Sequence, residues 1–507
     1  MRDLNFGAPV AERDMARGLE SYFIESAAFE RVRSGSKTII LGNRGAGKSA
    51  IFKVLGAREK VAGSHVIELA PEDYSYELLS STMAAAGAGS WAKHGAYAAA
   101  WKFLIYVLIM KAISAQGGKG VGPITKYLRN NHHDPHASGL TLLVSYLKRI
   151  EGIKLGPIAA GFKSRELDKL YKLEEVHALL PQLTEILSRR RVIVLVDELD
   201  RGWDSSEDAK AFVSGLFQAC VSMNELHPNL RVYVSLRQEL YDDIPALYED
   251  AQKYRDLLET ISWTDDLLLK LIAKRIRHCA AKAGHNPLAL AEASDLACWN
   301  AVFATPPSHN SASSFRYMID RTLYRPREVI QFCAQTVESA RERAASLPLP
   351  YAAVSWTERG YSAERAQDIA AEYRFQYPGL LGVFDAFRHQ PETLSRPELE
   401  LICLELAMGD IPTAGTANWI LDRDPASIIE VLWHIGFLTA RPARHRQGDP
   451  GNGAKPGASP FLGSYQTRHL NLASVEQFQV HPMFRSYLDI IRQRPTPARP
   501  PAPVAGP

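Results

Sequence analysis

Apolar residues along the 507-residue chain follow two patterns. Short continuous runs rich in branched residues, typical of buried strands, occur at Thr38–Leu41, Val66–Leu69, Arg191–Val196 and Arg231–Leu236. Between them, and over residues 1–37, apolar residues recur at helical spacing. Strands that alternate with helices predict a parallel sheet with helices on both faces.

A glycine-rich turn follows the first predicted strand. Residues 42–49 match the phosphate-loop pattern G-x-x-x-x-G-K-[ST] at every fixed position. Glycines let backbone N–H groups turn inward around phosphate oxygens, and the following helix points its positive end at the same anion. Lys48 is predicted to reach the β- and γ-phosphates, and the Ser49 hydroxyl to bind Mg²⁺. The predicted nucleotide-binding residues are Gly42, Asn43, Arg44, Gly45, Ala46, Gly47, Lys48, Ser49 and Ala50.

Two acidic residues follow the third predicted strand. Asp197 stands at its carboxyl end, the edge where α/β sheets bind ligands, and is predicted to hold Mg²⁺ through water. Glu198 is predicted to polarise the attacking water. By themselves the two acids could merely cap a strand, but the phosphate loop earlier in the chain favours catalysis.

A glutamate directly after such an aspartate marks the additional-strand, catalytic-glutamate division of P-loop ATPases, which includes AAA+ and STAND proteins. The chain resembles a bacterial STAND/AAA+-like ATPase over roughly residues 15–340, because LGNRGAGKSAIF, VIVLVDELDRGW, VYVSLR, ISWTDDLLLKLIAKRI and YRPREVIQF occur in the expected order. This resemblance implies ATP binding and hydrolysis with Mg²⁺.

Pattern and resemblance together predict an α/β fold with a parallel-sheet P-loop NTPase core. About 150 residues separate Lys48 from Asp197, more than a compact core of this kind uses, so the helical stretch between them is predicted to be an insertion. The predicted parts are the core (1–261, with the insertion at 73–188), a helical lid (262–345), a winged-helix-like domain (356–492) and a Pro- and Ala-rich disordered tail (493–507).

Two arginines are candidates to complete the site. Arg237 and Ser235 end the fourth predicted strand, where the resemblance implies a sensor-1-type contact with the γ-phosphate or its water. Arg327 begins a helix after Pro326 and resembles a sensor-2 element in a lid. The alternatives are an ordinary surface arginine for Arg237 and pairing with a nearby carboxylate such as Glu328 for Arg327. Whether the completing arginine acts in cis or in trans stays open.

The C-terminal region has the order of a winged helix, with predicted helices at 397–408, 417–421 and 426–435 before two strands and an intervening loop. The last helix offers Ser427, Glu430 and His434 but no Lys or Arg, which weakens specific reading of DNA bases. The loop is basic and could contact phosphates, although a soluble flexible loop explains it equally well. Its basic residues are Arg441, Arg444, His445, Arg446 and Lys455, with Arg468 beyond it.

The composition and the apolar segments also indicate where in the cell the protein is located. The net charge of +3 neither demands nor excludes a nucleic-acid partner, and five dispersed cysteines without a CxxC predict reduced thiols. The N-terminus lacks an apolar signal segment. The apolar stretch at 95–115 contains Lys102 and is predicted to be a buried helix. We therefore expect a cytoplasmic protein without a membrane partner.

The leading functional hypothesis is an ATPase that acts as a conformational switch or assembly engine. The resemblance suggests a homo-oligomer in bacterial anti-phage defence with a separate effector protein. The alternative is a DNA-binding or DNA-remodelling ATPase that holds DNA through its C-terminal domain.

Overall fold

The computed structural model describes residues 4–70, 90–131, 139–150, 173–200, 203–244, 247, 254–283, 292–305, 313–411, 417–421, 423–442, 460–467 and 470–491. It divides into two compact units. The sheet unit comprises Phe6–Lys282 and Arg325–Ile330, and the helical unit comprises Met1–Asn5, Ala283–Tyr324 and Gln331–Pro507. The predicted tail at 493–507 lies outside the described residues.

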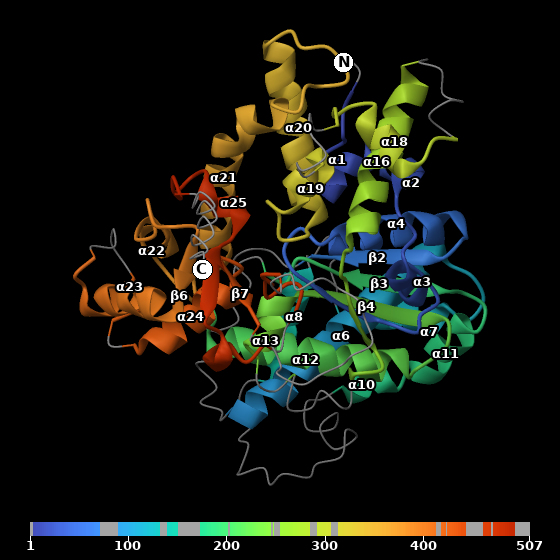
Figure 1. Ribbon diagram of the computed structural model, residues 1–507. Coiled ribbons are helices and arrows are strands. Elements are labelled where there is room, and N and C mark those ends of the chain that lie inside the picture. Colours follow the sequence, from blue (N-terminus) through green and yellow to red (C-terminus); the bar gives the residue numbers. More distant parts are fainter. Residues whose placement is uncertain are drawn as a thin grey trace, which may run out of the picture. The chain divides into compact units, whose positions relative to one another are not determined.

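The sheet unit contains five parallel strands in the order β2-β3-β4-β1-β5. Strands β2, β3 and β4 are labelled in Figure 1. The predicted parallel sheet is confirmed, and β4 lies between the phosphate-loop strand β1 and the strand β3 that precedes Asp197. The sequence pattern did not reveal β5, which has only three residues and buries the carboxylate of Glu259 against Arg31 at 2.6 Å. The strands are β1 (Ile39–Gly42), β2 (His65–Leu69), β3 (Val192–Val196), β4 (Leu230–Arg237) and β5 (Leu258–Thr260).

Successive residues of the central strands enter different cores, because side chains alternate between the two faces of a strand. Ile40, Ile193 and Leu195 pack in the core beside α4 (Lys48–Val61). Ile39, Val192 and Val194 instead join a larger core on the other face. Burial on both faces explains why these strands read as continuous apolar runs.

Short helices accompany α4 on its face of the sheet. Residues 1–37 were predicted to be helical, but a left-handed Gly18 (φ 102°) and an extended Phe23 (φ −61°, ψ 143°) break the described part. The resulting helices are α1 (Ala11–Met15), α2 (Leu19–Tyr22) and α3 (Ala27–Arg33).

The opposite face is covered by a long helix, α6 (Ser90–Gln116), which packs on α12 (Glu207–Asn224). Residues His94–Gln116 are long and apolar enough to span a membrane by length and composition alone, but 72% of the most apolar window is buried inside the structure. The Trp101 Nε1 donates to Phe212 O at 3.1 Å. Among the described residues from β2 to β3, all the regular elements are helices: α6, α7 (Gly122–Asn130), α8 (Gly139–Ile150), α10 (Glu174–His177) and α11 (Leu180–Leu187).

Helix α16 (Asp265–Lys282), predicted as the start of the lid, belongs to the sheet unit. The helical unit then contains α18 (Asp295–Asn300), α19 (Ser314–Ile319) and α21 (Ala353–Glu372). Helix α20 (Pro326–Glu342) begins in the sheet unit and continues into the helical unit. The predicted domain boundaries stay predictions.

A winged-helix arrangement follows in the helical unit, as predicted. Its antiparallel sheet has the order β6-β8-β7, and the residues between β7 and β8 include the predicted wing, of which 443–459 and 468–469 lie outside the described residues. The predicted helix at 417–421 is wrong, since Ile420 N and Arg423 N each bond a carbonyl three residues earlier, as in a turn. The elements are α22 (Leu380–Asp385), β6 (Thr393–Ser395), α23 (Arg396–Met408), α24 (Pro425–His434), β7 (Leu438–Arg441), β8 (Gln477–Val480) and α25 (Pro482–Arg485).

The α6–α12 contact depends on a glycine. A Cβ on Gly215 would lie 2.7 Å from Ala98 N and 2.9 Å from the Tyr97 carbonyl carbon, so Gly215→Ala must push the helices apart. We expect a loss of about 1–3 kcal/mol of unfolding free energy in urea, despite alanine's better helix propensity. Gly360→Ala in α21 is the control, because nothing lies within 4 Å of its Cβ and it should be neutral or stabilising. Equal effects of the two substitutions would contradict this packing.

Candidate nucleotide-binding site

The phosphate loop forms the turn between β1 and α4. Gly45 and Gly47 have φ of +81° and +100°, a conformation that favours glycine. A Cβ on Gly45 would also approach Arg327 Cβ to 3.0 Å. The sequence pattern and the backbone therefore agree on a turn whose N–H groups and helix start suit an anion.

Lys48 extends along the loop. Its Nζ donates to Gly42 O at 2.6 Å and to Asn43 O at 3.2 Å, and the side chain is partly buried. Burial lowers the pKa of Lys48, whereas the carboxylate of Glu239 opposes that shift. The Lys48 ammonium group thus lies inside the phosphate loop, where it was predicted to reach the phosphates.

The predicted acidic pair lies at the carboxyl edge of the sheet. Asp197 N donates to Leu69 O at 3.0 Å, and Asp197 Oδ1 accepts from Ser235 Oγ and, at 2.9 Å, from Glu198 N. Glu198 has a positive φ of 58°, which is uncommon for a residue with a side chain. Ser49, Asp197 and Glu198 all line one cavity, so the structure brings the predicted metal and catalytic residues together.

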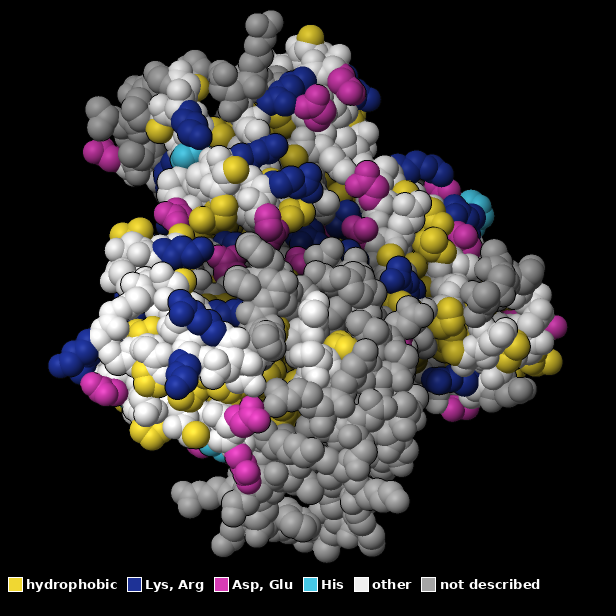
Figure 2. Space-filling model, turned by 180° about the vertical axis from the view of Figure 1, so that it is seen from behind, with side chains coloured by type: hydrophobic (Ala, Val, Ile, Leu, Met, Phe, Trp, Pro, Cys, Tyr) yellow, Lys and Arg dark blue, Asp and Glu magenta, His cyan; other side chains and the backbone are white. Residues whose placement is uncertain are grey.

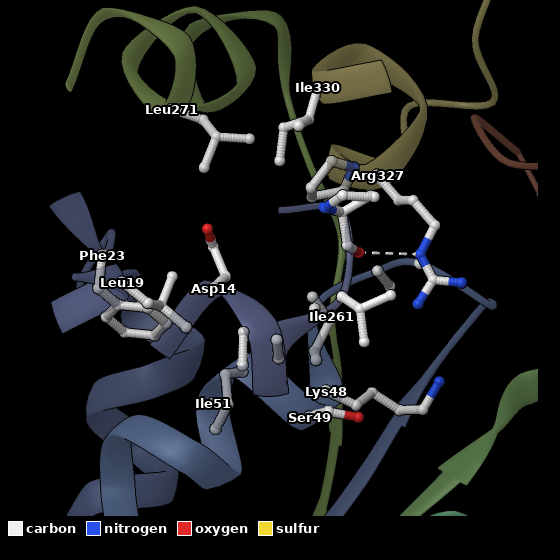
Figure 3. Close-up of a pocket in the computed structure, with 18 of the residues that line it drawn as sticks. Asp14, Leu19, Phe23, Lys48, Ser49, Ile51, Ile261, Leu271, Arg327 and Ile330 are labelled. Carbon is white, nitrogen blue, oxygen red and sulfur yellow. Dashed lines mark hydrogen bonds between the residues drawn. The ribbon is translucent and has the colours of Figure 1, made fainter. Parts of the chain in front are cut away.

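Both predicted arginines line the same cavity. Arg237 ends β4 opposite Gly42 of β1 and is ion-paired with Asp200. Arg327 N lies 3.5 Å from Gly45 O, and Arg327 Nε donates to Pro9 O at 3.2 Å (Figure 3). The expected alternative pairing with Glu328 is instead made by the neighbouring Arg325, with a nitrogen–oxygen distance of 3.6 Å.

The cavity has a volume of about 270 Å³ and two chemically different ends. Figure 3 shows Lys48, Ser49 and Arg327 together on one side. Apolar side chains from α2 and the residue after it, and from α4, α16 and α20, line the rest; they include Leu19, Phe23, Ile51, Leu271 and Ile330. A charged end beside an apolar end suits a phosphate ester of an aromatic base.

Two aromatic residues lie at the apolar end of the cavity. Tyr22 and Phe23 both line it, and both also pack in the core beside α4, where Tyr22 is buried and Phe23 is partly buried. Packing in the core and lining the cavity are therefore compatible for these two side chains.

Sequence reasoning missed a buried polar cluster that holds the N-terminal segment. Asp14 Oδ2 accepts from Arg275 Nη2 at 2.8 Å, and Asp14 Oδ1 accepts from Tyr22 Oη at 2.8 Å and from Ala8 N at 2.6 Å. The side chains of Asp14 and Arg275 are 2% and 4% exposed. Burial and the bond to Asp14 raise the pKa of Tyr22. No local motif indicates a pair separated by more than 250 residues.

The residues at the charged end fit a magnesium ion. Ser49 and Asp197 supply the hydroxyl and carboxylate oxygens that Mg²⁺ prefers. Such an ion usually takes few protein ligands, with phosphate and water oxygens completing its coordination. Within the described ranges, no group of three or more His, Cys, Asp or Glu residues is arranged to hold a metal.

Comparisons with known proteins extend this description. Residues 266–370, from α16 into α21, match the family described as FunZ-associated C-terminal helical domain. A relative from Escherichia coli (strain K12), named "Putative transposon gamma-delta 80.3 kDa protein", is 25% identical over 452 residues. The matched region covers 86% of this chain and 61% of the relative, so the chain spans less than two thirds of that protein.

A solved structure also matches, described as the Aeropyrum pernix ORC2 protein in ADPNP-ADP complexes. It covers 95% of both chains at 12% identity, with a TM-score of 0.29. A TM-score that low does not define a shared fold. The P-loop NTPase-like fold is instead defined by the strand order and the phosphate loop. None of these matches names a STAND protein, and that subtype stays a prediction.

Trp263 is a further residue that motif reading did not assign. Its Nε1 donates to Ala46 O at 2.8 Å, and its ring carbon Cζ2 lies 3.9 Å from the Cβ position of Gly47. Trp263 therefore ties the phosphate loop to the residues that precede α16.

We expect Trp263→Phe to weaken ATP and ADP binding by roughly three- to tenfold, since the ring is kept but one hydrogen bond worth about 0.5–1.5 kcal/mol is lost. Titration calorimetry measures both affinities. Trp356→Phe, in α21 of the helical unit, is the matched control. Unchanged affinity in Trp263→Phe would show that the loop holds its shape without this bond.

Proposed function

We propose that the cavity binds ATP with Mg²⁺ and that the chain hydrolyses it. The observation that carries this proposal is the convergence of the phosphate loop, Lys48, Asp197 and Glu198 on one cavity at the carboxyl edge of a parallel sheet. The apolar end of the cavity accommodates the base.

Each residue has a distinct task in this proposal. The backbone N–H groups of 45–49 and the Lys48 ammonium group hold the phosphate oxygens. A Mg²⁺ ion held by Ser49 and Asp197 would neutralise phosphate charge. Glu198 accepts a proton from the water that attacks the γ-phosphate, because a carboxylate beside that water acts as a general base. Ser235 orients the Asp197 carboxylate through its hydrogen bond.

We further propose that hydrolysis drives a conformational switch or assembly step in the cytoplasm. A homo-oligomer, anti-phage defence and a separate effector remain predictions from the family resemblance. The relative from Escherichia coli is named as a putative transposon protein, which gives this chain no activity by itself.

The DNA-binding alternative receives little support from the described surface. Helix α24 exposes Glu430 and His434, and Arg441 is engaged by Gln477 at 2.6 Å and by the Phe461 ring. On the face drawn in Figure 2, Lys and Arg side chains are interspersed with Asp and Glu side chains. The other basic residues of the predicted wing lie outside the described residues: Arg444, His445, Arg446, Lys455 and Arg468. DNA binding stays a prediction.

Lys48→Ala should abolish detectable ATP binding without unfolding the protein, because it removes the ammonium group inside the loop and leaves the apolar cores intact. Titration calorimetry measures binding, and thermal unfolding tests integrity. Lys53→Ala on the same helix, which removes the ion pair with Glu68 and leaves the phosphate loop unchanged, should bind ATP normally. If Lys48→Ala bound ATP as tightly as the unmodified protein, the phosphate site would be elsewhere.

Glu198→Gln should bind ATP but turn it over on the order of 10²-fold more slowly, since glutamine keeps the shape and cannot accept the proton. Phosphate release under saturating ATP measures the rate. Glu225→Gln, an exposed carboxylate at the end of α12, is the charge-matched control. Normal turnover in Glu198→Gln would move the catalytic base to another residue.

A further inference from the structure

Arg237 lies between two carboxylates at the edge of the cavity. One guanidinium nitrogen, Nη2, pairs with Asp200 Oδ2, and the other, Nη1, lies 3.9 Å from Glu239 Oε1. The side chains of Arg237, Asp200 and Glu239 are 19%, 23% and 5% exposed. This is a partly desolvated ion pair, unlike the exposed pairs that contribute little to stability.

Asp200 lies in the turn after β3, and Arg237 ends the neighbouring strand β4. Asp200 follows β3 by four residues, just after Asp197 and Glu198, whereas Arg237 is the last residue of β4. Both line the cavity, whereas Glu239 is not among its lining residues. Arginine has a long side chain with several accessible rotamers, so a carboxylate partner restricts the position of its guanidinium group.

The pair also balances charge around the phosphate loop. The positive charge of Arg237 disfavours the ammonium form of Lys48. The carboxylates of Glu239 and Asp200 favour that form. Two cations near one phosphate site repel each other, and carboxylates beside them offset the energy of that repulsion. Asp200 therefore sits where it can both orient Arg237 and limit that repulsion.

We propose that Asp200 is a positioning residue for the hydrolysis step, which fixes Arg237 so that its remaining N–H donors face the γ-phosphate. Arginine has five N–H donors, so the pair with Asp200 leaves others for phosphate oxygens. This inference rests on the proposed ATPase function and deepens it. In this proposal Asp200 acts by positioning Arg237 and does not itself bind the nucleotide.

The test is a double-mutant cycle with Asp200→Asn, Arg237→Gln and the combined variant, measured as kcat and KM for ATP with ADP affinity alongside. We expect each single variant to lower kcat on the order of tenfold, with KM and ADP affinity changed by less than about twofold. The combined variant should be no slower than Arg237→Gln alone, because residues that act as one unit are not additive. Asp200→Glu, which restores the charge, should recover most of kcat.

Several results would overturn the proposal. Additive losses would mean that Asp200 acts independently of Arg237, and faster turnover in Asp200→Asn would mean that Asp200 competes with phosphate for the arginine. Matching losses of unfolding temperature and ADP affinity in both single variants would make the pair structural. Failure of the proposed ATPase function would give a different result from failure of the Asp200 proposal, because the unmodified protein would then neither bind nor hydrolyse ATP.

Discussion

Five parallel strands end at one edge of the sheet, and the register between β1, β4 and β3 determines which side chains meet there. Gly42 pairs with Arg237, and Val196 at the end of β3 pairs with Val234 of β4. Since β4 lies between the other two, Ser235 and Arg237 stand between the phosphate loop and the acidic pair. Burial on both faces fixes this register, because a slip of one residue would exchange the side chains of the two cores.

The apolar end of the cavity depends on a different constraint, the fixed path of the N-terminal segment. Asp14 and Arg275 are both nearly fully buried, so each is stable there only because the other is present. Gly7, with φ of +84°, passes so close that a Cβ would lie 2.2 Å from Arg275 Nη1. This cluster holds the residues around Pro9 against α16 and Arg327, and so completes the wall of the cavity.

The features that the sequence predicted well are local in the chain. The phosphate loop, the four longer strands and the acidic pair each lie within one contiguous segment, and the glycines and apolar runs there have direct physical causes. What escaped prediction joins distant segments: Trp263 to Ala46, Arg275 to Asp14, and Arg237 to Asp200. A tryptophan or arginine that forms such a bond looks the same in the sequence as one on a surface, so only the fold distinguishes them.

Short elements escaped prediction for a related reason. Three residues of β5 contain too few positions to show a period, and its Glu259 reads as a solvent-facing residue until Arg31 is brought beside it. In the winged helix, β6 likewise has only three residues, so the sequence indicated two of the three strands. The helices at 397–408 and 426–435 and the two returning strands were recognised, whereas β6 and the turn at 417–421 were not.

The position of Arg327 gives the proposed switch a physical route. Arg327 lies in the first turn of α20, whose remaining residues from Gln331 belong to the helical unit. A helix propagates displacement along its axis because consecutive turns are hydrogen-bonded. A ligand shifts a conformational equilibrium only by its different affinity for the two states, and ATP differs from ADP by the γ-phosphate alone. If Arg327 binds that phosphate, as its resemblance to a sensor-2 element predicts, the difference between ATP and ADP reaches the helical unit through one continuous helix.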